Sequence, residues 1–240
     1  MDITKVTRPV RKLLKLKYCG AVIVAAGSAT RMNGIDKMMA FLDGEPVILH
    51  TIRNFQNCDA IREIVIVTRQ DLVDPIMELC RGFEKVKAVV VGGNSREQSV
   101  HIGLDALSAK CKLAAIQDGA RPLAGWQLID RVVRAAHTYG AAVPAVPLKD
   151  TIKVVQGGIV DHTPDRSTLR AVQTPQVFDC DLLRAALIET KRNQWNITDD
   201  SSAVERLKMK VKVVEGDERN IKITTPMDLN IAELFLEDYL

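Results

Sequence analysis

Short apolar runs rich in Val, Ile and Ala alternate along the chain with segments whose apolar residues recur at helical spacing. The runs predict buried strands at 21–27, 63–68, 85–93, 112–118, 141–147 and 210–216. The periodic segments predict helices at 46–57, 71–83, 95–109, 126–140, 181–193 and 225–240. Such alternation is typical of a mostly parallel sheet with helices on both faces. The predicted fold class is therefore α/β and Rossmann-like.

The alternation stops at residues 148–167, where two short β-like runs flank Gly157 and Gly158. Paired glycines between such runs are a hairpin signal. An isolated two-stranded ribbon is marginally stable in water, so this hairpin is expected to pack on something. The pattern leaves two partners equally open, a second subunit or the chain's own sheet. Further on, the polar stretch 196–207 predicts a turn.

Length and charge narrow the class of protein. The chain has 240 residues and 47% hydrophobic content, which suits one large α/β domain. Its formal net charge is +3, but residues 1–17 contain six basic side chains against one aspartate, which leaves the remaining body at −2. With only 4% aromatics, that body lacks the basic stripe and stacking platforms of a nucleic-acid-binding protein. Residues 1–17 are best described as a basic N-terminal extension.

The cysteines and the apolar runs bear on location. Five scattered cysteines, without a C-x-x-C pair or a histidine at metal-ligand spacing, favour reduced, packed thiols in a cytoplasmic protein. The basic N-terminus before 21–27 imitates a secretory signal, but the apolar run is short and starts late. A core strand explains it better. No run approaches the roughly 20 apolar residues of a membrane span, so no membrane span is expected.

The loop after the first predicted strand is a candidate phosphate site. It opens with four small residues, Ala26, Gly27, Ser28 and Ala29. Their backbone N–H groups can approach a polyphosphate, and Arg31 and Lys37 add cations that oppose phosphate charge. Neither the Walker string nor the dinucleotide fingerprint is present. For this loop taken by itself, an ordinary strand-to-helix turn with two surface cations is a slightly better explanation than a phosphate site.

Two further loops change that balance. The segment 92–100 supplies two glycines followed by Asn94, Arg96 and Ser99 at a helix entrance, where Ser95 is a candidate cap. The segment 116–122 places Asp118 and Arg121 two small residues apart. Ligands of parallel sheets bind beyond the carboxyl ends of the strands, so three such loops would converge on one crevice. There Asp118 could orient a hydroxyl or help to hold Mg²⁺.

With these residues assembled, the chain resembles the 2-C-methyl-D-erythritol 4-phosphate cytidylyltransferases of the non-mevalonate isoprenoid pathway. The resemblance runs from about Cys19 to the closing helix. The matching segments, in family order, are AAGSATRM with Lys37, GGNSREQSV, DGARP, PLKDTIK, DRSTLRAVQTPQVF, ITDDSSAVE and GDERNIKITTPMDL. It implies a fold of the nucleotide-diphospho-sugar transferase type, with a single nucleotidyltransferase domain over 18–240. It also implies a protruding hairpin arm at about 148–168 that embraces a second subunit, and hence a homodimer.

The activity implied by the resemblance is transfer of a cytidylyl group from CTP to 2-C-methyl-D-erythritol 4-phosphate. The products would be 4-diphosphocytidyl-2-C-methyl-D-erythritol and pyrophosphate, with Mg²⁺ as cofactor. Arg31 and Lys37 would stabilise charge on the α-phosphate, while Arg166 and Lys222 would hold the attacking phosphate. The implied CTP-binding residues are Ala25, Ala26, Gly27, Ser28, Gly93, Asn94, Arg96 and Ser99. The implied contacts to the polyol phosphate or the metal region are Asp118, Arg121, Thr151, Thr174 and Thr198.

Several positions depart from the family pattern. The family commonly has glycine where Ala29 stands, and Ala29 would be strained if the loop requires positive φ there. Asp36 and Met38 replace the Pro and Gln often found around the lysine, and Gln117 precedes Asp118 where His or Val is usual. These changes affect loop geometry more than chemistry, because every cation is retained.

Two alternative functions remain. One is a cytidylyltransferase for another polyol phosphate such as ribitol 5-phosphate, although DGARP and ITDD favour the methylerythritol branch. The other is a non-catalytic CTP-binding module. A protein that only binds CTP has no need of all four cations named above, which argues against the second alternative.

Overall fold

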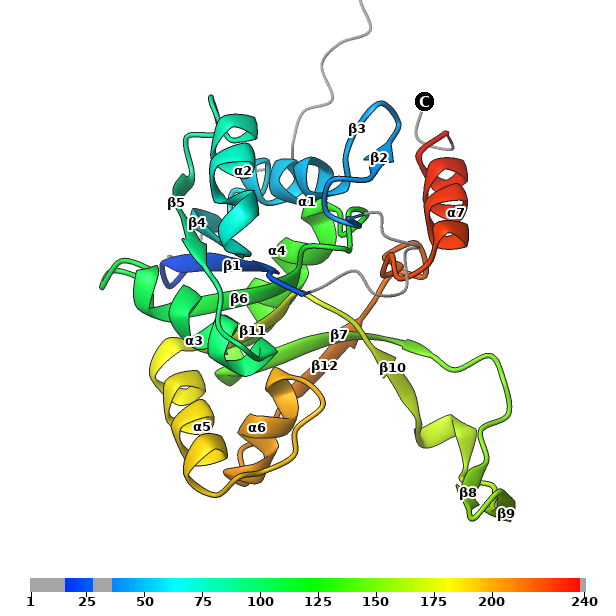
Figure 1. Cartoon of the computed structure of the whole chain (residues 1–240). Coiled ribbons are helices and arrows are strands. Elements are labelled where there is room, and N and C mark those ends of the chain that lie inside the picture. The colour runs from blue at the N-terminus through cyan, green and yellow to red at the C-terminus, as the bar shows by residue number, and fades with distance from the viewer. Residues whose placement is uncertain (1–15, 28–35, 238–240) are drawn as a thin grey trace, which may run out of the picture.

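The central sheet has eight strands within residues 16–27 and 36–237, the part of the chain that the computed structural model describes (Figure 1). They are β1 (Cys19–Ala25), β4 (Ile61–Thr68), β5 (Val86–Val91), β6 (Leu113–Asp118), β7 (Ala141–Pro147), β10 (Arg170–Val172), β11 (Gln176–Asp179) and β12 (Lys212–Glu215). Their order is β10-β7-β11-β6-β1-β4-β5, and β12 pairs with β7.

Most neighbouring strands are parallel, as predicted. β6, β1, β4 and β5 run in one direction, and β12 runs parallel to β7. The exceptions are β11, which is antiparallel to both β6 and β7, and β10, which is antiparallel to β7. Neither exception was predicted, because both strands are too short to show a period. The carboxyl ends of β1, β4, β5 and β6 therefore share one edge of the sheet.

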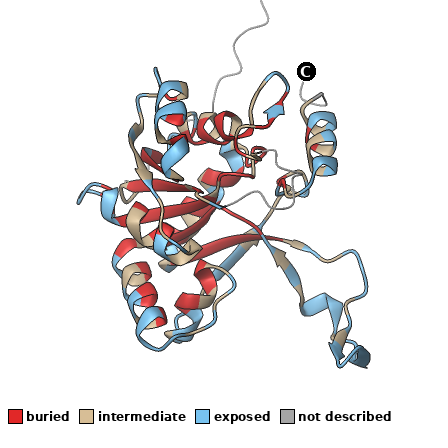
Figure 2. Cartoon of the chain, viewed as in Figure 1, coloured by how far each residue is buried: buried red, intermediate tan, exposed pale blue. Residues whose placement is uncertain are grey.

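Helices cover both faces of this sheet. The helices on one face are α1 (Val47–Gln56), α2 (Val73–Leu79), α4 (Trp126–Tyr139) and α7 (Pro226–Glu237). Those on the other are α3 (Arg96–Ala106), α5 (Cys180–Arg192) and α6 (Asp200–Arg206). Successive residues of β1 serve the two cores in turn, with Ala21 and Ile23 in the first and Val22 in the second. The buried sheet between its helices is evident in Figure 2.

Two helix starts illustrate how local sequence decides these elements. The Ser95 hydroxyl accepts the backbone N–H of Gln98 at 3.2 Å, so the predicted cap of α3 is confirmed. The prediction of a turn at 196–207 is wrong for its second half, which forms α6. There the Asp199 carboxylate accepts the N–H of Ser202 at 2.9 Å, and the Ser202 hydroxyl accepts the N–H of Asp199 at 3.3 Å. This reciprocal capping box begins a helix that is too short for a visible apolar period.

The strands β8 (Val154–Gln156) and β9 (Ile159–His162) form the predicted hairpin. Gly157 and Gly158 have φ angles of 57° and 81°, a conformation that suits glycine and gives the tight turn. Both strands are largely exposed, and the hairpin projects away from the body in Figures 1 and 2. Of the two packing alternatives, the chain's own sheet is thus not the one observed.

The remaining elements are small. β2 (Phe41–Leu42) and β3 (Glu45–Pro46) form a short hairpin before α1, and η1 (Gln70–Leu72) and η2 (Arg166–Thr168) are single 3₁₀ turns. All five cysteines are buried and free, as predicted. No helix in the described ranges is both long and apolar enough to cross a membrane. Most of the basic extension, residues 1–15, lies outside the described residues.

Candidate active site

The loops that follow β1, β5 and β6 line one cavity of about 340 Å³ at the carboxyl edge of the sheet. The predicted convergence of these loops is therefore observed. The cavity is lined by Val24, Ala26, Gly27, Lys37, Met38, Gly93, Asn94, Ser95, Arg96, Ser99, Asp118, Gly119, Ala120 and Lys222. Small residues and three cations dominate the wall, which suits a phosphorylated ligand.

Asp118, at the end of β6, is the electrostatic centre of this cavity. Its carboxylate lies 2.8 Å from Nζ of Lys222 and 3.6 Å from the guanidinium groups of Arg96 and Arg121. Burial alone would raise the pKa of Asp118, but these three cations outweigh it and hold that pKa below the ordinary value. The carboxylate is consequently ionised at neutral pH and fixes the cations around it.

Arg96 connects this centre to α6. Its Nη2 atom lies 2.7 Å from Oδ2 of Asp200, a carboxylate with no solvent exposure. Burial raises the pKa of Asp200, and Arg96 opposes that effect. Arg96 is thus held between the carboxylates of Asp118 and Asp200. Sequence analysis did not predict Asp200 as a site residue. The sequence feature that could have indicated it is the pair of aspartates at the end of ITDD.

The loop between β5 and α3 has its shape fixed from within. The N–H of Gly93 donates to the Ser99 hydroxyl at 3.1 Å, and the N–H of Asn94 donates to Oε1 of Gln98 at 2.9 Å. A Cβ atom at residue 93 would lie 2.5 Å from the Cβ of Gln98, so only glycine fits this close approach. Because those two N–H groups are engaged within the protein, they are not available as donors to a ligand.

Lys37 lies in a turn whose two ends are fixed. Oδ1 of Asp36 accepts the N–H of Met38 at 2.8 Å, and the Asp36 carbonyl accepts the N–H of Ala40 at 2.8 Å. Met38 is only 2% exposed and packs its sulfur toward Gly119 in the loop after β6. The turn therefore anchors the Lys37 backbone against the site.

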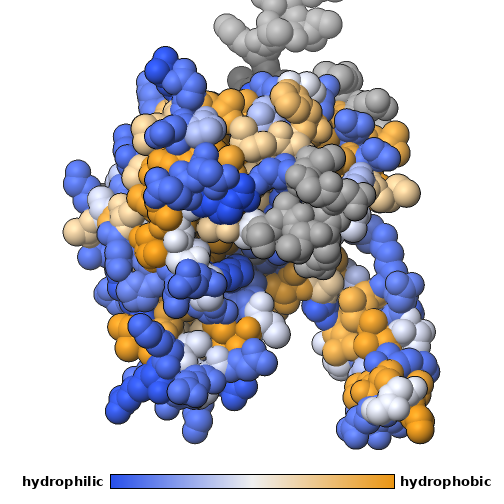
Figure 3. All heavy atoms as spheres, viewed as in Figure 1, coloured by the Kyte–Doolittle hydropathy of each residue, from blue (hydrophilic) through white to orange (hydrophobic). Residues whose placement is uncertain are grey.

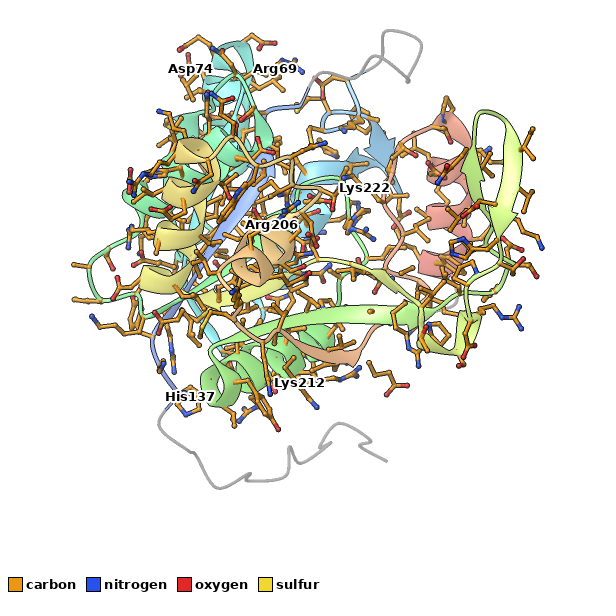
Figure 4. All side chains as sticks on the ribbon, turned by 90° about the horizontal axis from the view of Figure 1, so that it is seen from below. Arg69, Asp74, His137, Arg206, Lys212 and Lys222 are labelled. Carbon is orange, nitrogen blue, oxygen red and sulfur yellow. The ribbon has the colours of Figure 1, made fainter. Side chains whose placement is uncertain are left out.

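Lys222 is placed by a segment tied to the loop after β6. The Arg121 guanidinium donates to the Asn220 carbonyl at 2.6 Å, and the N–H of Ile223 donates to the Ala120 carbonyl at 2.8 Å. These bonds bracket Lys222 on both sides. In Figure 4, Lys222 lies in the upper half of the view, away from His137 and Lys212 near the lower edge.

Six of the predicted site residues that the structure describes do not line the cavity, and one of them, Arg121, lies beside it at 3.6 Å from the Asp118 carboxylate. Ala25 is buried at the end of β1, and Thr174 is buried behind the site, where its hydroxyl accepts the N–H of Asp118 at 3.1 Å. Thr198 is exposed just before α6. Thr151 and Arg166 are exposed in the arm segment and do not line the cavity. Their substrate contacts stay predictions.

Three residues of the phosphate loop cannot be placed in this way. Ser28, Ala29 and Arg31 lie outside the described residues, so the predicted roles of Ser28 and Arg31 and the strain at Ala29 stay predictions. The loop on either side is described, with Gly27 and Lys37 both in the cavity wall.

The fit to Mg²⁺ can be judged from the donors present. Among the described residues, no three His, Cys, Asp or Glu side chains are grouped to hold a metal ion. The Asp118 carboxylate does line the cavity. Mg²⁺ is typically bound by one or two carboxylates together with substrate phosphates and water, so this donor set fits an ion that arrives with a nucleotide.

Comparisons with known proteins agree with this geometry. A family model for 2-C-methyl-D-erythritol 4-phosphate cytidylyltransferase (IspD) matches residues 19–238. The relative of that name from Caldanaerobacter subterraneus subsp. tengcongensis is 44% identical over 221 residues, covering 90% of this chain and 97% of the relative. The one from Dehalococcoides mccartyi strain 195 is 45% identical, covering 91% of this chain and 96% of the relative.

Solved structures agree as well. The 4-diphosphocytidyl-2C-methyl-D-erythritol synthase of Anaerococcus prevotii superposes with a TM-score of 0.84 at 33% identity, covering 92% of this chain and 96% of that one. The cytidylyltransferase of Thermus thermophilus gives 0.75 at 30% identity, covering 90% and 98%. Because the family model spans most of the sequence and these relatives match nearly end to end, this chain belongs to the 2-C-methyl-D-erythritol 4-phosphate cytidylyltransferase family.

Proposed function

We propose that this chain transfers the cytidylyl group of CTP to 2-C-methyl-D-erythritol 4-phosphate, a step of the non-mevalonate isoprenoid pathway. The products are 4-diphosphocytidyl-2-C-methyl-D-erythritol and pyrophosphate. The observation that carries the proposal is the cavity in which Lys37, Arg96 and Lys222 surround Asp118 at the carboxyl edge of the sheet. Membership of the family supplies the substrates.

The residue types suit this chemistry. An oxygen of the polyol phosphate attacks the α-phosphorus of CTP, and the bond from that phosphorus to the bridging β-phosphate oxygen breaks. Pyrophosphate leaves with that electron pair, and no proton has to move. Catalysis can therefore rest on alignment and charge neutralisation. In the proposal Lys37 and Arg31 stabilise the α-phosphate, while Lys222 and Arg166 hold the attacking phosphate.

The nucleoside end of the cavity supports cytosine as the base. Cytosine carries an N4 amino donor, where uracil carries a carbonyl acceptor. The N–H groups of Gly93 and Asn94 are engaged within the protein, and in the proposal the carbonyl oxygens of this loop accept the N4 amino group. Mg²⁺ bound between Asp118 and the CTP phosphates would supply further neutralisation of charge.

The arm supports a homodimer. Val155, Ile159 and Val160 in the hairpin are 54%, 76% and 53% exposed. Figure 3 shows hydrophobic atoms gathered on this projecting segment. Exposed apolar residues on a ribbon that lacks a core of its own favour a second subunit as the partner. Five buried, free thiols also favour the cytoplasm as the location of this enzyme.

One assay tests the function. Pyrophosphate release is measured with CTP and Mg²⁺ in the presence of either 2-C-methyl-D-erythritol 4-phosphate or ribitol 5-phosphate. We expect release that depends on the first substrate. Faster release with ribitol 5-phosphate would instead support the other branch. CTP binding without release from either substrate would support the binding module.

A further inference from the structure

Arg69 lies at the carboxyl end of β4 and joins two carboxylates. Its Nε and Nη2 atoms donate to the two oxygens of Asp71 at 3.1 and 2.9 Å. The remaining nitrogen, Nη1, lies 2.5 Å from Oδ2 of Asp36. The contact with Asp71 thus orients the guanidinium, and one nitrogen is left for Asp36. Figure 4 shows Arg69 near an outer edge of the molecule, at a distance from Lys222 in that view.

Asp36 directly precedes Lys37 in the chain. Its Oδ1 caps the turn through the N–H of Met38, while Oδ2 contacts Arg69. A carboxylate at this position is an electrostatic problem for a phosphate site. It adds a negative charge one residue from Lys37, and such a charge opposes the approach of a polyphosphate to the cavity that Lys37 lines.

We propose that Arg69 is a positioning residue that neutralises Asp36, so that the positive charge of Lys37 acts on the nucleotide phosphates. The inference rests on the proposed function for the identity of the ligand. Asp36 fixes the turn through its other oxygen, and Arg69 balances the charge that comes with it. Both partners are mostly shielded from solvent, with side-chain exposures of 31% for Arg69 and 21% for Asp36.

The test is a double-mutant cycle in the full-length chain. Arg69→Met leaves the Asp36 carboxylate uncompensated, and we expect kcat/KM for CTP to fall about tenfold. Asp36→Asn keeps an oxygen for the turn and removes the charge, with an expected loss of about threefold or less. The double variant should recover to within about threefold of wild type, because the uncompensated Asp36 charge is gone and the Asp71 carboxylate, at 65% side-chain exposure, stays solvated without Arg69. A pair that served only to hold the fold would instead leave the double variant at least as poor as Arg69→Met.

Two controls separate charge from packing. Arg69→Lys keeps a cation beside Asp36 and should retain most of the activity. Arg81→Met makes the same substitution at an exposed ion pair with Glu78 and should leave kcat/KM unchanged. Melting temperatures of all variants are measured in parallel. Recovery of activity in the double variant without recovery of Tm would assign the effect to charge at the site.

The outcomes also separate this inference from the proposed function. Suppose that the wild-type chain turns over, but that Arg69→Met keeps kcat/KM within about twofold of wild type or that the double variant fails to recover. The inference about Arg69 is then wrong, while the proposed function stands. If the wild-type chain binds CTP·Mg²⁺ without turnover, the proposed function fails. The CTP·Mg²⁺ affinity of each variant, measured by calorimetry, then replaces kcat/KM in the double-mutant cycle. Weakening by Arg69→Met and recovery in the double variant would then still support the inference. A wild-type chain that does not bind CTP·Mg²⁺ overturns both.

Discussion

Single charges in this site act through their neighbours. Asp200, Arg96, Asp118 and Lys222 form a continuous row of alternating charge that begins beneath the cavity wall at Asp200 and runs along it. In each contact of this row a carboxylate and a cation compensate each other's charge. A substitution at one position therefore leaves an uncompensated partner as well as a lost contact. Lys37 lines the same cavity from a different loop, the one after β1.

At this scale the first prediction concerns Lys37→Ala. A cation that meets charge developing on the α-phosphate acts mainly in the transition state, so kcat should fall by about a hundredfold while CTP affinity changes far less. Steady-state kinetics together with CTP titration by calorimetry separate the two. A rise in KM with unchanged kcat would show that Lys37 serves ground-state binding instead.

The second prediction concerns the pH dependence of stability. Because the cations hold the pKa of Asp118 below its ordinary value, ionised Asp118 stabilises the fold above the unfolded pKa. That contribution is lost as the pH falls through the folded pKa. Asp118→Asn lacks it, so the difference in unfolding free energy between wild type and variant should shrink between about pH 5 and pH 2. Urea unfolding across this range measures it, and a constant difference would contradict the assignment.

At the scale of elements, length decided what the sequence could predict. β4 is long enough to display a continuous apolar run and α4 to display a helical period, and both appear where the pattern indicates. β11 has four residues, and its place between β6 and β7 is set by pairing with strands far away in sequence. No local pattern specifies such pairing. The antiparallel insertion in the sheet therefore had to come from the structure.

The residues of the candidate site also fall into two groups, those that local sequence predicts and those that it does not. Small residues and cations after β1, β5 and β6 are visible locally, because topology brings such loops to one edge. The role of Asp200 depends on Arg96, which is 104 positions away in the chain. Nothing beside Asp200 in sequence indicates that partner. Roles fixed by burial and by distant ion pairs thus lie beyond a reading of single loops.

The capping box of α6 yields the third prediction. Asp199 accepts the N–H of Ser202 and also bonds the amide group of Gln176 at 2.7 Å and the hydroxyl of Ser201 at 2.8 Å. Asp199→Ala should therefore lower the unfolding free energy by about 2 kcal/mol, near the upper end for a helix cap. Chemical denaturation measures the loss. Asp199→Asn, which keeps an acceptor, is the matched control and should lose less.

At the scale of the whole molecule, two predicted substrate contacts, Thr151 and Arg166, lie in the arm and not in the cavity wall. Arg166 is exposed in the arm, where it donates to the Lys149 carbonyl at 2.6 Å. If it holds the polyol phosphate, it does so in the proposed dimer, and Arg166→Ala should raise KM for that substrate while CTP affinity stays nearly intact. Kinetics with each substrate varied in turn test this. Equal losses for both substrates would contradict the role.

The last prediction asks whose active site the arm completes. Thr151 lies in the exposed arm segment, and Lys37 lies in the cavity of the body. If the arm reaches the neighbouring subunit, Thr151→Asp and Lys37→Ala should each be nearly inactive alone. In a mixed dimer, one active site then receives both lesions and the other receives neither. With free exchange half of the dimers are mixed, so an equal mixture should regain about a quarter of wild-type activity.

The opposite arrangement gives a different number. If Thr151 serves the cavity of its own subunit, every site in the mixture carries one lesion, and mixing restores nothing. Two affinity tags, one on each variant, establish that mixed dimers have formed before activity is compared. The tagged mixed dimer can then be isolated, and its activity should be about half that of wild type, because one of its two sites is intact. Recovery in the isolated species would place the arm in the partner's site, since no other pairing of these lesions leaves a site whole.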